Sequence, residues 1–139
     1  MVTKQKYSAK REAILALLRS TESHPGAQWV YEQLKPRIPD LSLATVYRNL
    51  NTFRQDGLAL SLGVVGSEER FDGITEPHPH LICSCCGAVF DLSPDKAKTL
   101  IQTCKKKFSR KGPFIIDFRK TVFYGLCRNC CGDDDPGAV

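Results

Sequence analysis

The chain has 139 residues, of which 42% are hydrophobic, and a formal net charge of +5. This length supports one good core or two small ones. No segment approaches the ~20 apolar residues of a membrane-spanning helix, and the polar start Met1–Lys6 does not resemble an export signal. We therefore expect a cytoplasmic protein. The modest positive charge permits nucleic-acid binding without establishing it.

The first half of the chain has the pattern of three helices followed by a hairpin. Ser8 is a good cap for the first helix, Pro36 ends the second, and Gly57 is a natural stop for the third. The helices are expected at residues 8–20, 28–35 and 41–57, and the hairpin strands at 58–65 and 68–71. This order is that of a winged helix-turn-helix domain.

The third predicted helix has two chemically different faces. At 3.6 residues per turn, one arc is apolar and comprises Leu43, Val46, Leu50 and Phe53. The other arc carries a positive charge, amides and hydroxyls, which reach base edges and phosphates in a major groove. An ordinary amphipathic surface helix shows the same pattern, but the position before a hairpin favours DNA binding. The residues expected to contact DNA are Thr45, Tyr47, Arg48, Asn49 and Thr52.

The second half is expected to be a small α/β domain, so that the whole chain is α+β. Ser93 and Pro94 mark the start of a helix with an apolar face, and the domain is expected to have an apolar surface suited to pairing with a copy of itself. Its strands are expected at 80–84, 88–92, 113–118 and 121–126, with the helix at 94–108. The predicted organisation is a DNA-binding domain at 1–72, a Gly- and Pro-rich hinge at 73–79, a dimerisation and metal-binding domain at 80–131, and an acidic tail at 132–139.

Four of the seven cysteines form two Cys-x2-Cys pairs. Without an export signal, such cysteines are interpreted as metal ligands rather than disulfides. Two pairs on separate turns can surround zinc tetrahedrally at ~2.3 Å, whereas a disulfide or unconnected buried thiols would not need the matched spacing. We expect structural Zn²⁺ bound by Cys83, Cys86, Cys127 and Cys130. The spacing leaves Cys85 and Cys131 out of phase, and Cys104 is expected in a core.

The three histidines of the chain and two aspartates form a second candidate metal site. His78 and His80 alternate along an extended segment, so both rings can point to one side. Asp72 ends the hairpin, Asp91 lies on the strand expected to run antiparallel to His80, and His24 precedes the second helix. A His-x-His pair alone is often a surface accident, so spacing leaves the convergence open. Nitrogen and oxygen ligands without sulfur suit Fe(II) or Mn(II).

Several motifs together resemble the Fur family of bacterial metal-dependent repressors, over roughly residues 8–130. They are LATVYRNL at 43–50, RFD at 70–72, HPH at 78–80, CSCCG at 83–87 and YGLCRNC at 124–130. The resemblance implies a homodimer that a regulatory metal closes on a palindromic operator DNA, repressing transcription. It also implies structural zinc on the paired cysteines. The regulatory ligands that it implies are His24, Asp72, His78, His80 and Asp91.

Within this family, two aspartates among the implied ligands resemble the peroxide-sensing PerR branch, because iron-sensing members more often have glutamate there. The chain also lacks the further histidines with which many iron sensors build an extra site. The mechanism implied by this resemblance is Fe(II)-catalysed oxidation of a ligand imidazole, that of His24 or His78, followed by loss of the metal and release of DNA. Mn(II) would support repression without that sensitivity.

Other functions stay open on the sequence. An iron- or manganese-responsive Fur-type repressor of metal homeostasis would use the same ligands, and a zinc or nickel sensor is a further alternative, although the regulatory ligands include no cysteine. From a different class, a zinc-ribbon redox protein would use Cys85, Cys104 or Cys131 as a thiol of low pKa. An enzyme is not expected, because no Ser or Cys nucleophile has a histidine partner outside the metal sites.

Overall fold

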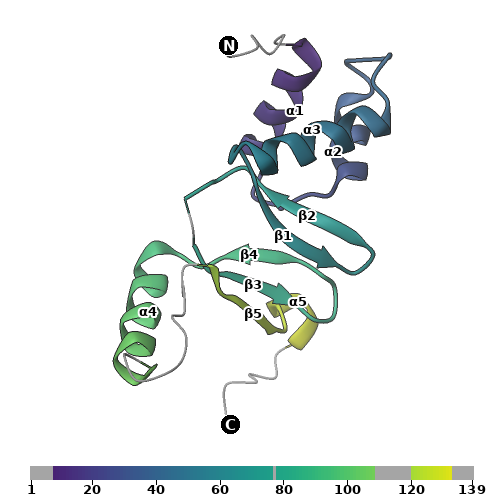
Figure 1. The fold of residues 1–139 in the computed structure, drawn as a ribbon. Helices are drawn as coiled ribbons and strands as arrows, with labels where there is room; N and C mark the ends of the chain where they lie inside the picture. The colour runs from purple at the N-terminus through teal and green to yellow at the C-terminus, as the bar shows by residue number, and fades with distance from the viewer. Residues whose placement is uncertain (1–7, 77, 109–119, 133–139) are drawn as a thin grey trace, which may run out of the picture. The chain divides into compact units, whose positions relative to one another are not determined.

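The protein is described here by a computed structural model that covers residues 8–76, 78–108 and 120–132. It divides into two compact units, Met1–Thr75 and Glu76–Val139 (Figure 1). The boundary between them lies within the Gly- and Pro-rich stretch at 73–79, and the finer domain limits expected from the sequence stay predictions. None of the described helices combines the length and hydropathy needed to cross a bilayer.

The first unit contains the three predicted helices, α1 (Ala9–Ser20), α2 (Ala27–Leu34) and α3 (Leu43–Gln55). The hydroxyls of Ser8 and Ser42 cap α1 and α3, each by accepting a hydrogen bond from the backbone N–H three residues further on. The capping serines explain why both helices begin where the sequence predicts.

The core of the first unit lies between the helices and a β-hairpin. The apolar face predicted for α3 is buried in it except for Leu43, which is half-buried at its margin, as are Leu15 and Leu17 of α1. Each fully buried large side chain contributes about 1.5–3 kcal/mol to folding, so this cluster holds the helices together. The buried members are Ile14, Leu18, Ala27, Val30, Leu34, Leu41, Val46, Leu50, Phe53, Ala59 and Phe71.

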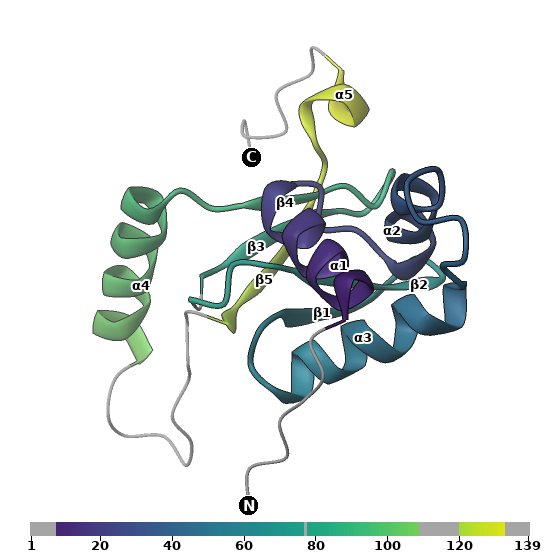
Figure 2. The ribbon, with the colours of Figure 1, turned by 90° about the horizontal axis from the view of Figure 1, so that it is seen from above.

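The hairpin consists of β1 (Leu60–Val65) and β2 (Glu68–Asp72), which pair antiparallel as predicted. Its turn contains Gly66, whose φ of 71° is a left-handed conformation that glycine adopts without a steric cost. Helices α1 and α2 contact β2, whereas α3 contacts β1 (Figure 2). Three helices followed by this hairpin confirm the winged helix-turn-helix fold.

The second unit is built on a three-stranded sheet with the order β4-β3-β5. The strands are β3 (His80–Cys83), β4 (Val89–Asp91) and β5 (Val122–Gly125). Strand β4 runs antiparallel to β3 and β5 runs parallel to it. Helix α4 (Pro94–Phe108) confirms the predicted helix, whereas the strand expected at 113–118 lies outside the described residues.

Strand β3 carries a potential metal ligand at each of its ends. Its first residue, His80, pairs with Asp91 of β4 and with Val122 of β5. Its last residue, Cys83, pairs with Gly125, and a short helix follows at that end of the sheet, α5 (Arg128–Cys131) (Figure 1). This last helix was not predicted from the sequence.

Candidate metal centres

The four paired cysteines come together because β5 runs parallel to β3. Both strands therefore end on the same side of the sheet, and each continues directly into its Cys-x2-Cys segment. The first segment turns sharply, with the N–H of Gly87 donating to the carbonyl of Cys83 at 2.9 Å. In the second segment, Cys127 directly precedes α5, and the N–H of Cys130 donates a hydrogen bond to the carbonyl of Cys127 at 2.9 Å. Two tight turns thus present four sulfurs to one point.

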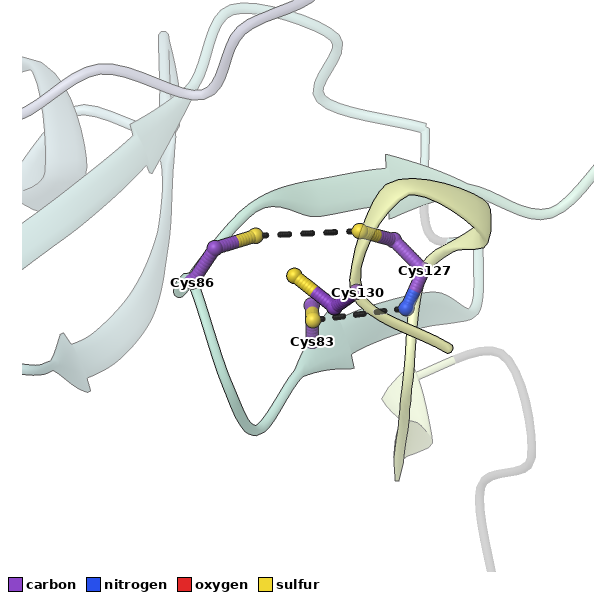
Figure 3. Close-up of side chains that lie close together, drawn as sticks. All are labelled: Cys83, Cys86, Cys127 and Cys130. Atoms are coloured by element: carbon purple, nitrogen blue, oxygen red, sulfur yellow. Dashed lines mark hydrogen bonds between the residues drawn. The ribbon is translucent and has the colours of Figure 1, made fainter. Parts of the chain in front are cut away.

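The geometry of this cluster fits a zinc ion. The four Sγ atoms all lie within 4.8 Å of one another (Figure 3). Those of Cys86 and Cys127 are 3.8 Å apart, which matches the edge of about 3.8 Å of a tetrahedron with Zn–S bonds of ~2.3 Å. A disulfide would require about 2.05 Å, and all seven cysteines are free thiols.

The electrostatics of the cluster call for a cation. Hydrogen bonds from the backbone N–H groups of Cys86 and, to a smaller extent, Cys127 lower the pKa of the Cys83 thiol to about 6. The backbone nitrogen of Cys127 lies 3.3 Å from Sγ of Cys83. The neighbouring thiols, first that of Cys127 and then that of Cys85, raise the pKa of Cys130. The Cys83 thiol therefore loses its proton readily, whereas the Cys130 thiol does so less readily than a free cysteine. A divalent cation stabilises all four thiolates together.

The three remaining cysteines lie in different surroundings. Cys85 is exposed in the first turn, and Cys104, expected in a core, is only half-buried on α4. The thiol of Cys131 lies 3.7 Å from the carbonyl of Arg128 and 3.6 Å from that of Gly132. The thiol whose pKa is clearly lowered, that of Cys83, is buried within the cluster instead. This arrangement favours a structural role for the cluster over a reactive thiol.

The first unit brings together two of the five expected regulatory ligands, which lie far apart in sequence. His24, in the loop before α2, is 3% exposed, and Asp72, at the end of β2, is 4% exposed. Nε2 of His24 lies 3.4 Å from Oδ2 of Asp72. The other oxygen, Oδ1, accepts a hydrogen bond from the N–H of Ile74 at 2.8 Å. That bond fixes the carboxylate with Oδ2 turned towards the imidazole.

The second unit brings together the other three. Oδ1 of Asp91 lies 2.8 Å from Nε2 of His78 and 3.1 Å from Nε2 of His80, and the two ring centroids are 4.3 Å apart. Nδ1 of His78 lies 2.7 Å from the carbonyl oxygen of Glu76. A carbonyl only accepts, so in a neutral ring whose Nε2 binds a metal, Nδ1 would carry the proton and donate it to this oxygen. Nε2 is then the nitrogen with a lone pair for a metal.

Both groups of side chains suit a metal bound by nitrogen and oxygen. Two ligands at right angles, each about 2.1 Å from a metal, are about 3.0 Å apart. The separations of 2.8–3.4 Å within each unit are close to this value. Imidazole and carboxylate ligands without sulfur favour Fe(II) or Mn(II) over a soft ion such as Cu(I). Each group therefore has the spacing and the chemistry of part of such a site.

The residues of α3 that are exposed to solvent coincide only in part with the residues expected to contact DNA. Tyr47, 45% exposed, and Arg48 face solvent as expected. Thr45, Asn49 and Thr52 are half-buried, and their side chains form hydrogen bonds within the helix or with its capping residue. The Asn49 amide donates to the Thr45 carbonyl and the Thr52 hydroxyl donates to the Arg48 carbonyl, each at 2.8 Å. These internal bonds leave the three side chains less available to DNA than a helical wheel suggests.

Asn51 is an exposed residue of α3 that the sequence reasoning missed. It follows Tyr47 by four positions, so the two share one face of the helix. This spacing of four residues from Tyr47 is the sequence signal that could have placed Asn51 on the exposed face. The exposed residues of α3 are Ala44, Tyr47, Arg48, Asn51, Arg54 and Gln55.

Comparisons with known proteins agree on one family. A family model described as the ferric uptake regulator family matches residues 3–114. The peroxide-responsive repressor PerR of Staphylococcus epidermidis is 33% identical over 121 residues, which are 87% of this chain and 78% of that protein. The crystal structure of the Campylobacter jejuni peroxide stress regulator superposes with a TM-score of 0.66 at 31% identity, covering 87% of this chain and 88% of that one. The Helicobacter pylori ferric uptake regulator Fur, described as having three functional metal binding sites, has a TM-score of 0.69 over 94% and 85% of the two chains, and its 20% identity shows likeness of fold alone.

Proposed function

Because the chain belongs to the ferric uptake regulator family, we propose that it is a homodimeric, metal-dependent repressor that senses peroxide. Members of the family are transcriptional regulators, and relatives of this chain at 31–33% identity are peroxide-responsive. In this proposal the cysteine cluster holds structural Zn²⁺, and Fe(II) or Mn(II) binds the imidazoles and aspartates. The metal-loaded dimer binds a palindromic operator through α3, and oxidation releases it.

We propose that the regulatory site joins His24 and Asp72 of the first unit to the His78, His80 and Asp91 group of the second. Two or three protein ligands leave several coordination positions of Fe(II) or Mn(II) open, and the five ligands together would fill more of them. The chain between Asp72 and His78 has five residues, so it spans at most about 20 Å when fully extended. A metal bound by both groups would restrict the hinge. It would thereby set the spacing of the two α3 helices of a dimer, which must match two half-sites on DNA.

The oxidation step follows from the chemistry of the imidazole ligands. When bound, Fe(II) supplies the electrons that activate hydrogen peroxide at the site. In the net reaction, one peroxide oxygen is added to a ring carbon of His24 or His78 and the other leaves as water. The product ring is an imidazolone, with a hydrogen on each nitrogen. Nε2 then has no lone pair in the ring plane to offer, so the histidine stops being a ligand and the metal is lost.

The observation that carries this proposal is the direct pairing of imidazoles with aspartate carboxylates. Asp91 lies against both histidines of its unit, and Asp72 lies against His24. An aspartate is one methylene shorter than a glutamate, so it holds a metal closer to its own strand and leaves more of the metal open to peroxide. We expect that difference to separate a peroxide sensor from a sensor of metal availability, and the Asp91→Glu variant tests it.

The test uses the full-length, zinc-loaded protein without oxygen. Separate samples receive Fe(II) or Mn(II), then one equivalent of hydrogen peroxide. The intact mass, the peptide masses and the affinity for a duplex selected from a random-sequence library by the Mn(II)-loaded protein are measured. We expect a gain of one oxygen atom on a His24 or His78 peptide and loss of DNA binding with Fe(II) only. Asp91→Glu, which retains the charge, should bind DNA with Fe(II) but oxidise more slowly.

Two other results would change the assignment. An unchanged mass, with DNA released only by a chelator, would identify an iron- or manganese-responsive repressor of metal homeostasis. DNA binding that responds to neither metal nor peroxide would refute metal-dependent repression altogether. The Mn(II) sample is the matched control for both, because it fills the same ligands without activating peroxide.

A further inference from the structure

The loop that carries His24 adopts a conformation that its own sequence does not favour. Among the described residues other than glycine, His24 alone has a positive φ, at 50°. This left-handed conformation is costly for a residue with a Cβ atom, and it persists only where surrounding groups hold it. The buried position of the imidazole therefore depends on contacts made by the loop backbone.

Strand β2 supplies these contacts along three consecutive residues of the loop. The guanidinium of Arg70 donates through Nε to the carbonyl of His24, and through Nη2 to the carbonyl of Ser23 at 2.9 Å. The backbone N–H of Phe71 donates to the carbonyl of Pro25 at 3.0 Å. A planar guanidinium with two donors in a fixed fork holds two carbonyls in one orientation. It thereby fixes the peptide groups on both sides of the His24 Cα.

A second residue of β2, Glu68, holds the far end of the same loop. Helix α2 begins after Gly26, which has no side chain to cap it. Oε1 of Glu68 accepts a hydrogen bond from the N–H of Gln28 at 2.9 Å, and a carboxylate is also favoured by the dipole at a helix N-terminus. A Cβ atom on Gly26 would lie 1.9 Å from Cδ of Glu68. This glycine therefore leaves the space that the carboxylate occupies.

The two contacts and the ligand come from one face of one strand. Side chains at alternate positions of a strand point to the same side, and Glu68, Arg70 and Asp72 are spaced in this way. The side chains of Glu68, Arg70 and Asp72 thus all reach the His24 loop from β2. Glu68 caps α2, Arg70 binds the loop carbonyls, and Asp72 is the proposed carboxylate ligand. We name Glu68 and Arg70 the β2 brace.

We propose that the β2 brace consists of positioning residues that set the affinity of the regulatory site by holding His24 in its ligand-competent conformation. This inference rests on the proposed role of His24 as a ligand. The brace orders the loop before the metal arrives, so binding does not bear the entropy of ordering it. Without the brace, the loop populates other conformations, and the apparent affinity falls in proportion to the fraction that stays competent.

The experiment measures Mn(II) affinity of the zinc-loaded, full-length protein by competition with a fluorescent chelator. Arg70→Gln removes the clamp and Glu68→Gln weakens the cap. Gly26→Ala displaces the Glu68 carboxylate without changing any charge. We expect each to weaken Mn(II) binding by about tenfold or more, which corresponds to a competent fraction of about one tenth. Glu69→Gln is the matched control, because Glu69 lies on the same strand but bonds to Ser61 instead.

A second measurement separates positioning from general damage. Hydrogen exchange of the metal-free protein should be faster at the amides of residues 23, 24 and 26–28 in the brace variants, with α3 amides and zinc content unchanged. Arg70→Lys, which retains the charge but not the fork, should recover only part of the affinity. Gly26→Ala keeps the test decisive if Arg70→Gln does not fold.

Two outcomes would overturn the inference in distinguishable ways. Normal Mn(II) affinity in Glu68→Gln, Arg70→Gln and Gly26→Ala, with weakened binding in His24→Ala, would refute the brace and leave the proposed function intact. Normal affinity in His24→Ala itself would refute its role as a ligand, and the brace with it.

Discussion

Removal of zinc from the cysteine cluster is expected to unfold the second unit and leave the first unit folded. The first unit has a core of eleven buried residues that includes neither a cysteine nor a proposed metal ligand. In the described part of the second unit, the buried apolar side chains other than cysteine are Pro79, Ile82, Val89 and Ala97. The zinc cluster therefore takes the place that a larger apolar core would have.

The free energies of side-chain burial and of zinc binding explain why the second unit should depend on zinc. Ile82 and Val89 contribute about 1.5–3 kcal/mol each by burial. Structural zinc contributes ~10–16 kcal/mol of folding free energy in small zinc-dependent peptides at neutral pH. The metal term thus exceeds these two buried side chains together by several kcal/mol. Losing it should carry the second unit past its unfolding midpoint.

The chain contains a convenient probe for the first unit. Its single tryptophan, Trp29, lies on α2 at the margin of the first core, so its fluorescence reports on that unit. Hydrogen exchange at the β3 amides reports on the second. We expect a strong zinc chelator, or the Cys127→Ser substitution, to abolish protection in β3 while the Trp29 emission stays native. Cys85→Ser is the control, because this exposed thiol lies outside the cluster.

Two results would contradict this reasoning. Protection of the β3 amides that survives verified loss of zinc would show that the second unit folds on its apolar contacts alone. A shift of the Trp29 emission at the same chelator concentration would show that the first unit does not have an independent core.

Three further predictions concern single side chains. Arg48→Ala should weaken DNA binding and, if the guanidinium contacts a phosphate, reduce the slope of log affinity against log salt by about 1, measured by a salt titration. Asp91→Asn removes the charge next to His78 and His80 and should weaken Mn(II) binding by at least about tenfold, with unchanged zinc stoichiometry as its control. Gly73→Ala would place a Cβ atom within 2.8–2.9 Å of the α1 backbone, and should lower the free energy of unfolding of the first unit by about 1–3 kcal/mol in a urea titration.

Local periodicity was sufficient to predict most of the fold. The spacing of Val46 and Phe53 on α3, the capping residue Ser8 of α1 and the Ser93–Pro94 start of α4 are short-range signals, and each element that they predict is present. The matched Cys-x2-Cys spacing predicted which four sulfurs come together. Helix α5 was missed because its four residues are too few to show a helical period.

The candidate regulatory site was less accessible to sequence reasoning. The identities of its residues came from a resemblance between motifs, because spacing did not establish that they converge. The support for His24 was also hidden, since the contacts of Arg70 with it join residues 46 positions apart. Their only local signal is the alternation of polar residues along β2. Of the residues expected on the outer face of α3, Tyr47 and Arg48 are exposed. Asn49 and Thr52 are half-buried and bond to carbonyls of their own helix, which a helical wheel does not show.

Because β3 is short, we expect the order of its His80 end to depend on metal binding at its Cys83 end. Its four residues place Cys83 about 10 Å from His80, at ~3.3 Å per residue. A strand of this length has no interior that could stay ordered after one end is released. We therefore expect that zinc on the cysteine cluster must bind first for the ligands around His80 to become ordered. Newly synthesised protein without zinc would then lack the proposed response to a regulatory metal, whatever the concentration of that metal.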